Sequence, residues 1–332
     1  MTRLAVIGAG SWGTTFAKVL ADGGAEVLLW ARREELADEI NLSHRNGDYL
    51  PGVNLPIGIK ASADIAEVLA GVSQVYLSVP SQSLRENLAE WGHLIPKDAL
   101  VVSLMKGVEK DSGLRMSQVI AEAGIEPERI VVVSGPNLAL EIADEQPAAS
   151  VAASSSLQSA KLVAAASSNS YFTTFTNTDV IGTEFGGILK NLIAVAIGIV
   201  NGVGYGQNTK ASIMTRGVSE ISRFAVAFGA KPQTMVGLAG LGDLIATSES
   251  PLSRNHKAGE MLGKGYSKKE VLARLSQTAE GLASVSTILE LARAKGISMP
   301  IAEQVELVIE GNMSPRDIAP HLTHETEEPQ GE

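Results

Sequence analysis

The chain has 332 residues, of which 45% are hydrophobic and none is cysteine, and its formal net charge is −10. This length allows two domains with separate cores, and the hydrophobic share excludes general disorder. The acidic balance argues against nucleic acid as a partner, and the lack of cysteine excludes disulfides, thiolate nucleophiles and Cys-ligated zinc.

The N-terminus opens with an apolar run from Leu4 to Ile7, which predicts a strand. The six residues that follow, Gly8-Ala9-Gly10-Ser11-Trp12-Gly13, lead into a helical pattern that lasts to about Gly23. In this motif the first glycine allows a tight turn, the second lets a pyrophosphate approach the backbone, and the third lets helix and strand pack closely. The helix N-terminus then offers N–H groups to the phosphates. A glycine-rich turn without a ligand is the alternative, but the flanking strand and helix favour a dinucleotide site.

The second predicted strand, Glu26 to Trp30, is followed by Arg32 and Arg33 and by a charged helix from about Glu34. In this fold the end of the second strand meets the adenosine ribose, where a carboxylate suits NAD and an arginine suits the 2′-phosphate of NADP. The two arginines therefore favour NADP over NAD, although both cofactors could be accepted. A solvated helix start is the alternative reading of the same residues.

Strands and helices continue to alternate up to about residue 180. Asn41 to Gly58 is predicted to be a loop, with Tyr49 in its one apolar anchor. Further strands are expected at Gln74–Val79, Ala99–Met105, Ile130–Ser134, Pro147–Ala153 and Tyr171–Thr176, and helices at Ala63–Ala70, Leu84–Trp91 and Leu114–Ala123. This alternation predicts an α/β domain over residues 1–180, with a parallel, doubly wound sheet of the Rossmann type.

Polar residues follow three of these strands, at Ser78–Ser81, Lys106-Gly107 and Ser134–Asn137. Ligands of open α/β sheets bind beyond the carboxyl ends of the strands, so we expect these turns to line one crevice. Lys106 is accordingly a candidate for contact with substrate or cofactor. The alternative is an ordinary surface lysine that follows a strand.

The remaining chain shows helical periodicity only, which predicts an all-α domain over residues 181–322. The expected helices are Val180–Val203, Thr209–Phe228, Asn255–Leu262, Lys268–Ser276, Ala283–Lys295, Ile301–Ile309 and Pro315–His321. The acidic residues 323–332 are expected to form a disordered tail.

Targeting and membrane signals are weak in this sequence. The run before Gly8 is too short for a signal peptide and lacks a basic leader, so we expect a cytoplasmic protein. The most apolar segment, Leu192–Val200, is shorter than the roughly 20 apolar residues that span a bilayer. We therefore expect a helix buried in a bundle and no membrane insertion.

Lys190 and Asp243 in the second half form a candidate catalytic group. Lys190 stands at the head of the most apolar helix, where a lysine must extend to solvent, pair with an acid, or lose its proton through desolvation. A neutral lysine is a general base, whereas a lysine at a helix edge has no catalytic role. Asp243 follows a glycine-rich turn, with Thr247 one helical turn later. Asp243 could orient Lys190 or hold it charged, and it could equally cap a helix.

Ser253-Arg254-Asn255 precedes another predicted helix, a combination that suits a phosphate. Arg254 would give a planar fork of donors, and the helix start would add N–H groups. A capped helix with a surface arginine is the alternative. The five histidines show no metal-ligand spacing, so no metal is expected.

With these residues in place, the chain resembles the NAD(P)-dependent glycerol-3-phosphate dehydrogenases of the bacterial type along essentially its whole length. The matching blocks are Gly8–Gly13, Lys106-Gly107, Ser134-Gly135-Pro136, Leu189-Lys190-Asn191, Gly240–Leu244, Ser253-Arg254-Asn255 and Glu280-Gly281. The resemblance implies interconversion of dihydroxyacetone phosphate and sn-glycerol 3-phosphate with NADP or NAD, NADPH being favoured, for phospholipid synthesis.

The resemblance also implies roles for individual residues. Lys190 looks like the proton donor or acceptor, assisted by Lys106 and Asp243. The substrate pocket would comprise Lys106, Gly135, Asn137, Lys190, Asn191, Asp243, Thr247, Ser253, Arg254 and Asn255. The cofactor would meet Gly8, Gly10, Ser11, Trp12, Gly13, Arg32, Arg33, Tyr49, Lys106, Ala139, Arg254, Thr278 and Glu280. Asn137 and Thr278 depart from the family pattern, which usually has Ser or Thr at the first position and an apolar residue at the second.

Two other functions fit part of the same pattern. A β-hydroxyacid dehydrogenase also joins a nucleotide-binding domain to helices and uses a lysine, but it acts on a carboxylate. A non-catalytic NADP-binding sensor would keep the glycine motif without the chemistry. The expected partner is a small phosphorylated triose, and a homodimer is plausible for a helical domain of this kind, although no particular face indicates it.

Overall fold

The computed structural model describes residues 2–275 and 279–319. The chain divides into two compact units, the first ending at Glu184 and the second beginning at Phe185. The boundary expected at residue 180 coincides with the first residue of the long helix α8 (Val180–Val203), so α8 begins in the first unit and continues in the second.

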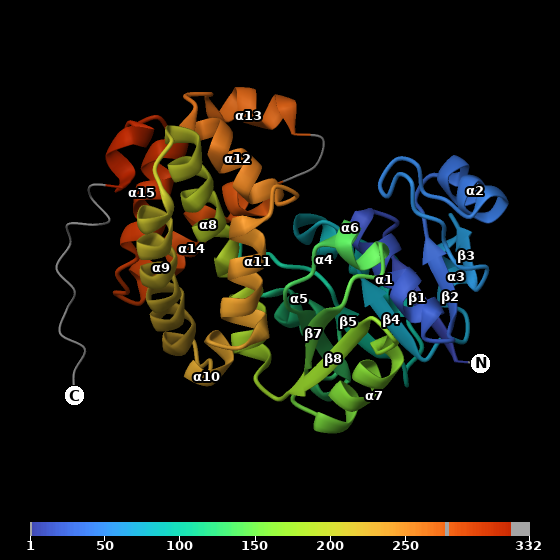
Figure 1. Cartoon of the computed structure of the whole chain (residues 1–332). Coiled ribbons are helices and arrows are strands. Elements are labelled where there is room, and N and C mark those ends of the chain that lie inside the picture. The colour runs from blue at the N-terminus through green and yellow to red at the C-terminus, as the bar shows by residue number, and fades with distance from the viewer. Residues whose placement is uncertain (1, 276–278, 320–332) are drawn as a thin grey trace. The chain divides into compact units, whose positions relative to one another are not determined.

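The first unit contains an eight-stranded sheet with the order β3-β2-β1-β4-β5-β6-β7-β8 (Figure 1). Its strands are β1 (Arg3–Ile7), β2 (Glu26–Trp30), β3 (Ile59–Ser62), β4 (Gln74–Leu77), β5 (Leu100–Ser103), β6 (Ile130–Ser134), β7 (Ala148–Ala153) and β8 (Phe172–Asn177). The order reverses between β1 and β4, which is the point where doubly wound sheets bind their ligands. The predicted Rossmann-type fold is confirmed.

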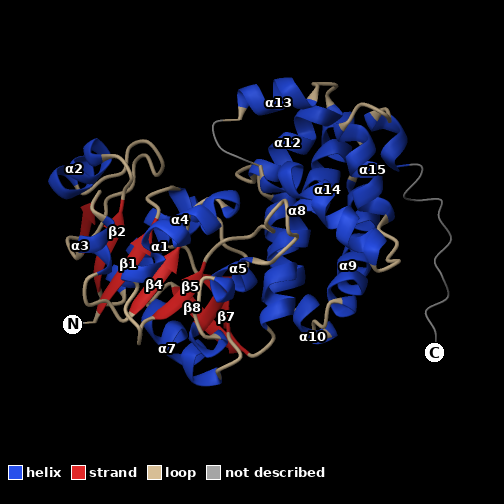
Figure 2. Ribbon diagram, turned by 180° about the vertical axis from the view of Figure 1, so that it is seen from behind, coloured by secondary structure: helices blue, strands red, loops and turns tan. Residues whose placement is uncertain are grey.

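Helices cover both faces of this sheet (Figure 2). One face packs against α1 (Ser11–Asp22), α2 (Glu34–Ser43), α6 (Ala139–Ala143) and α7 (Leu157–Ser167), and the other against α3 (Ile65–Leu69), α4 (Leu84–Trp91) and α5 (Met116–Glu122). Leu4 and Val6 of β1 belong to the first core, and Ala5 and Ile7 to the second. Because both faces are buried, these strands read as continuous apolar runs rather than as an alternation.

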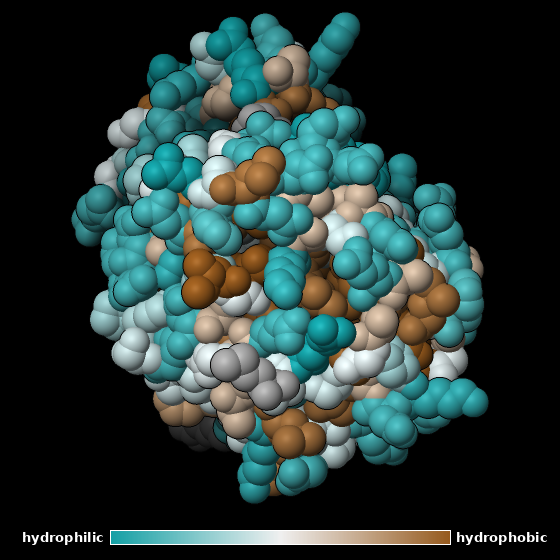
Figure 3. Space-filling view, turned by 90° about the vertical axis from the view of Figure 1, so that its right-hand side faces the viewer, coloured by the Kyte–Doolittle hydropathy of each residue, from teal (hydrophilic) through white to brown (hydrophobic). Residues whose placement is uncertain are grey.

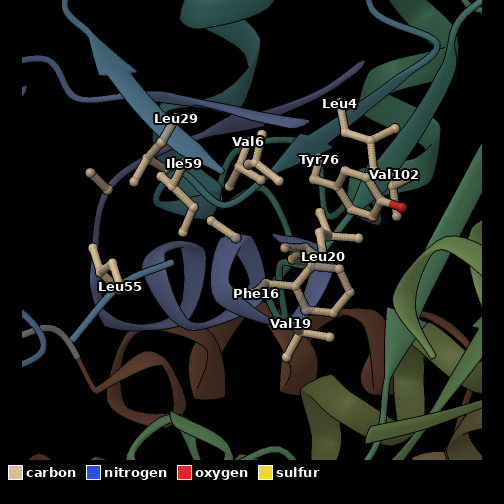
Figure 4. Close-up of a cluster of buried hydrophobic side chains, with 14 of the residues drawn as sticks. Leu4, Val6, Phe16, Val19, Leu20, Leu29, Leu55, Ile59, Tyr76 and Val102 are labelled. Carbon is tan, nitrogen blue, oxygen red and sulfur yellow. The ribbon is translucent and has the colours of Figure 1, made fainter. Parts of the chain in front are cut away.

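Helix α1 is held on the sheet by its aromatic and aliphatic side chains. Phe16 and Leu20 point from α1 toward the side chains of the strands, Val19 lies beside Phe16, and Phe16 lies 5.3 Å from the ring of Tyr76 on β4 (Figure 4). All four side chains are fully buried. This packing fixes the helix whose N-terminus lies within the glycine motif.

Three features of the first unit differ from the prediction. The four-residue strand β3 was not expected, because its alternation with the exposed Lys60 is too short to separate from a loop. The strands β6 and β7 run antiparallel, so the sheet is mostly rather than entirely parallel. The short α6 and α7 were also not expected, since α7 is rich in Ala and Ser and has a weak apolar stripe.

In the second unit, every regular element of the described residues is helical. After α8 come α9 (Gln207–Ala227), α10 (Pro232–Met235), α11 (Asp243–Glu249), α12 (Arg254–Gly263), α13 (Lys268–Arg274), α14 (Glu280–Ala294) and α15 (Pro300–Ile309). The helix expected at Pro315–His321 is a short 3₁₀ turn over Pro315–Asp317, and residues 320 and 321 lie outside the described part. Ser276 and the expected tail also lie outside it.

Helix α8 is the most apolar element of the chain. It has 24 residues, long enough to cross a membrane, but 83% of its most apolar stretch is buried, as in the core helix of a bundle. Gly198 and Gly202 on α8 lie against Gly259 and Gly263 on α12. A Cβ at Gly198 would lie 2.2 Å from the His256 carbonyl oxygen, and one at Gly259 would lie 2.1 Å from the Val195 carbonyl oxygen. The glycines therefore allow the two backbones to touch.

The surface is mainly hydrophilic on the face that Figure 3 shows, with several apolar groups between the polar residues. The most exposed large apolar side chains of the described residues are Leu42 and Ile57, which lie in and after α2 of the first unit.

Candidate active site

The glycine motif forms the turn between β1 and α1. Gly8 has φ +115°, and a Cβ there would lie 2.6 Å from the Ser78 carbonyl oxygen, at the end of β4. A Cβ at Gly13 would lie 1.9 Å from the Gly8 carbonyl oxygen, whereas one at Gly10 would meet nothing within 4 Å. Gly8 therefore makes the tight turn, Gly13 allows the close contact between helix and strand, and Gly10 leaves its side of the loop open, as this motif requires.

The N-terminus of α1 suits an anionic group. Gly10 is its N-cap and supplies no capping side chain, and its first turn has no acidic residue. The Trp12 indole Nε1 is buried without a hydrogen-bond partner, while its ring lies edge-on to Phe16 at 5.4 Å. Because the helix dipole adds positive potential at this end, the residues present fit the pyrophosphate of a dinucleotide.

A segment after α2 holds this loop, and one of its residues was missed by the sequence analysis. Asn46 is completely buried and donates hydrogen bonds from Nδ2 to the Ala9 carbonyl oxygen and to Thr14 Oγ1. Next to it, the Tyr49 carbonyl oxygen accepts a 2.6 Å hydrogen bond from Ser11 Oγ. A buried asparagine in a loop has no periodic pattern, so only its polar burial could have revealed it.

The two arginines after β2 differ in their surroundings. Both are exposed, and the Arg33 guanidinium forms an ion pair with Asp48. The hydrogen bond to this carboxylate raises the pKa of Arg33. Arg32 has no ion-pair partner within residues 2–275 and 279–319, so it is the more available of the two for a phosphate.

The turns after β5 and β6 meet, as predicted for the carboxyl ends of neighbouring strands. Lys106 Nζ donates a 2.9 Å hydrogen bond to the Gly135 carbonyl oxygen. The side chain of Asn137 is turned toward β7, since its Oδ1 accepts from Ser150 Oγ at 3.2 Å and its Nδ2 donates to the Ala149 carbonyl oxygen at 3.4 Å. The Ala139 carbonyl oxygen accepts from Thr15 Oγ1 at 3.3 Å, which links α6 to α1.

The candidate catalytic group lies in the second unit. Lys190 on α8 donates from Nζ to Asp243 Oδ1 at 2.8 Å and to Thr247 Oγ1, both on α11. The side chains of Lys190 and Asp243 are 8% and 1% exposed. Lys190 is therefore paired with an acid rather than extended to solvent. Asp243 is the first helical residue of α11 and not its N-cap, which is Gly242.

The residues next to this pair form a second buried network. Asn255 Nδ2 donates to Asn191 Oδ1 at 2.8 Å, and Asn255 Oδ1 accepts from the Gly281 backbone N–H at 2.9 Å. Ser253 caps α12 by accepting from the His256 N–H at 3.2 Å, and Arg254, the first residue of α12, is exposed. Glu280 begins α14, and Thr278 lies outside the described residues.

Two family models match most of the chain. The NAD-dependent glycerol-3-phosphate dehydrogenase N-terminus matches residues 3–160, and the C-terminus of the same family matches residues 179–320. The chain belongs to the NAD-dependent glycerol-3-phosphate dehydrogenase family.

Relatives and solved structures agree with this assignment. The glycerol-3-phosphate dehydrogenase (NAD(P)+) of Leifsonia xyli is 62% identical over 98% of this chain and 89% of its own length. The enzyme of the same name from Corynebacterium glutamicum strain R is 53% identical over 96% of both chains. The crystal structure of glycerol-3-phosphate dehydrogenase from Coxiella burnetii superposes with a TM-score of 0.92, at 35% identity, and covers 98% of this chain and 99% of that one.

Proposed function

We propose that this chain interconverts dihydroxyacetone phosphate and sn-glycerol 3-phosphate with NADPH or NADH. Family membership supports the reaction, and the observation that carries the chemistry is the buried Lys190 between Asp243 and Thr247. When bound, the nicotinamide cofactor supplies or accepts the hydride. The residues of the chain then bind the substrate, hold its carbonyl in place and move the proton.

Lys190 is the proposed proton donor in the reductive direction. As the ketone becomes an alcohol, its oxygen gains negative charge and needs a proton, which the Lys190 ammonium can give. Asp243 supplies a counter-charge for the ammonium, and the Thr247 hydroxyl is a further acceptor that orients Nζ. In the oxidative direction Lys190 accepts the proton from the alcohol instead.

Arg254 is the proposed phosphate ligand. It lies at the start of α12, where the guanidinium and the helix N-terminus both favour an anion. Ser253 caps that helix, and its hydroxyl proton can still be donated to an oxygen. Asn191 and Asn255 are hydrogen-bonded to each other through their side-chain amides, so each has fewer donors and acceptors left for the substrate.

The first unit contributes Lys106 and the proposed cofactor residues other than Glu280, which begins α14 in the second unit. We infer that Lys106 adds positive charge near the developing alkoxide, while Gly135 offers backbone only. Gly8, Gly10, Ser11, Trp12 and Gly13 are proposed to hold the pyrophosphate. Arg32, with Arg33, is proposed to favour NADPH, and Tyr49, Ala139 and Glu280 complete the proposed cofactor contacts.

We also infer a cellular role from this reaction. Reduction yields the glycerol 3-phosphate backbone from which phospholipids are built, in a protein that is proposed to work in the cytoplasm without membrane insertion. The burial of α8 supports the last point. Assembly as a homodimer stays a prediction.

The decisive experiment is a steady-state assay with dihydroxyacetone phosphate, in which NADPH and NADH are compared side by side through the nicotinamide absorbance. We expect turnover with both cofactors and a higher kcat/KM with NADPH. A 3-hydroxy acid assayed with NADP+ serves as the competing substrate, and activity on it alone would favour a β-hydroxyacid dehydrogenase. Binding of NADPH without turnover of any triose phosphate would instead indicate a sensor.

A further inference from the structure

Both the Nδ2 and the Oδ1 of the Asn46 side chain have hydrogen-bond partners, and these partners allow only one orientation of the amide. Its Nδ2 donates to the Ala9 carbonyl oxygen at 2.9 Å and to Thr14 Oγ1 at 2.8 Å. Its Oδ1 accepts from the Tyr49 backbone N–H at 3.2 Å. Because the Tyr49 N–H can only donate, the amide oxygen must face Tyr49 and the amide nitrogen must face Ala9. The orientation of Asn46 is thus set by the backbone around it.

The Ala9 carbonyl belongs to the peptide bond between Ala9 and Gly10. Peptide bonds are planar, and the described residues contain no cis bond, so the Ala9 C=O and the Gly10 N–H point in opposite directions. Holding the carbonyl on Asn46 therefore aims the Gly10 N–H away from Asn46. No acceptor in the part of the chain that the structure describes takes this N–H, and a Cβ at Gly10 would meet nothing within 4 Å.

We propose that Asn46 is a positioning residue of the dinucleotide site, which locks the Ala9–Gly10 peptide so that an N–H, and not a carbonyl oxygen, faces the pyrophosphate. The lock is needed because this peptide turns by rotation about Ala9 ψ and Gly10 φ, and Gly10, which has no Cβ, accepts a much wider range of φ than other residues. A rotated peptide would turn a partial negative charge toward an anion. This inference rests on the cofactor assignment of the proposed function.

The segment that carries Asn46 is itself well anchored. Leu50, four residues on, is buried in the core of the first unit, and its N–H donates to the Asn46 carbonyl oxygen at 2.9 Å. The Ser11 hydroxyl adds a second tie between the loop and the segment through the Tyr49 carbonyl oxygen. The brace therefore couples the loop to the core.

The test compares the affinity for NADPH of the wild-type protein, Asn46→Ala and Asn46→Asp, measured by nicotinamide fluorescence in the absence of substrate. Asn46→Asp keeps the size of the side chain and the acceptor for Tyr49 but removes both donors. We expect Kd to rise about 10- to 100-fold in both variants, the range for one hydrogen bond that orients a group toward a charged ligand.

Asn169 provides a matched control. Its Nδ2 donates to the Val19 carbonyl oxygen at 3.1 Å, near the other end of α1, and its Oδ1 accepts from the N–H groups of Tyr171 and Phe172. Asn169→Ala therefore removes the same kind of brace away from the glycine loop. We expect a similar loss of Tm but a Kd for NADPH within about threefold of the wild type.

Two results would overturn the inference: folded Asn46 variants that bind NADPH like the wild type, or an Asn169→Ala variant that loses as much affinity. If the Asn46 variants do not fold, the orientation of the Gly10 N–H toward the cofactor can be tested on the wild-type protein. Addition of NADP+ should move the Gly10 amide proton downfield in an NMR spectrum more than that of Gly23, and an unmoved Gly10 signal would contradict the proposal. A wild-type protein that binds neither NADPH nor NADH would instead refute the proposed function.

Discussion

Lys190 Nζ lies 2.8 Å from Asp243 Oδ1 in the second unit, and both side chains are almost completely buried. The two residues are 53 positions apart and lie on different helices, α8 and α11. Burial of a charge is unfavourable unless it is paired, so each residue depends on the other. This dependence gives two separate predictions, one for catalysis and one for stability.

Replacement of Lys190 should affect turnover more than binding. Lys190→Ala removes the proposed proton donor, and the loss should be about 10²- to 10⁴-fold in kcat, the usual contribution of a general acid. The Kd for NADPH should change little, because the proposed cofactor loop lies in the first unit. Steady-state kinetics and NADPH titration of the same preparation measure both quantities. Near-normal turnover would remove Lys190 from the mechanism.

The same pair should control stability. Lys190→Met removes the ammonium that pairs with the buried Asp243 carboxylate and should lower the free energy of unfolding by about 3–5 kcal/mol. The double variant Lys190→Met/Asp243→Leu removes both charges and should recover most of that loss. Urea denaturation of the wild type, the two single variants Lys190→Met and Asp243→Leu, and the double variant gives the coupling energy. If the losses of the two single variants add up in the double variant, the ion pair is not the cause of the lost stability.

Some features of the fold and of the site can be predicted from short sequence patterns, and others cannot. Continuous apolar runs identified most strands, and the glycine spacing identified the turn before α1. The direction of β7 could not be predicted, because an apolar run reads the same either way and the short α6 returns the chain without a full crossover. Asn46 was missed since its importance comes from burial against Ala9, which no local pattern encodes.

The choice between the two cofactors should depend on Arg32 more than on Arg33. Arg32→Ala should lower kcat/KM for NADPH about 10-fold, the lower end for a charge-assisted hydrogen bond at an exposed site, and leave that for NADH nearly unchanged. Arg33→Ala should have a smaller effect, because its guanidinium is already held by Asp48. Parallel assays with NADPH and NADH measure the ratio. Equal losses with both cofactors would argue against contact with the 2′-phosphate.

Glu220 should make stability depend on pH. Burial raises the pKa of its carboxyl group to about 7, although the N–H groups of Ile301 and Ala302, at the start of α15, donate to it. A raised folded-state pKa means that the native protein binds more protons than the unfolded chain between about pH 4.5 and pH 7, so this group's contribution to stability falls as pH rises through that window. Glu220→Gln should lack this contribution.

The measurement is urea unfolding of wild type and Glu220→Gln across that range. The free energy of unfolding of the wild type, relative to the variant, should fall by about 3 kcal/mol from acidic to neutral pH, since each pKa unit is worth about 1.4 kcal/mol. A constant difference would mean that the two backbone N–H groups keep the carboxylate ionised throughout.

The contact between α8 and α12 should tolerate no side chain. Gly259→Ala places a Cβ 2.1 Å from the Val195 carbonyl oxygen, so the helix backbones must separate. We expect a loss of more than about 3 kcal/mol in the free energy of unfolding, as for other overpacked core positions of this severity. Gly206→Ala is the matched control, because Gly206 has φ −83° and a Cβ there meets nothing within 4 Å. Because Gly206 is the N-cap of α9, Gly206→Ala should lower the free energy of unfolding by at most about 1 kcal/mol. Thermal and urea unfolding compare the two variants, and similar stabilities would mean that α8 and α12 can move apart without loss.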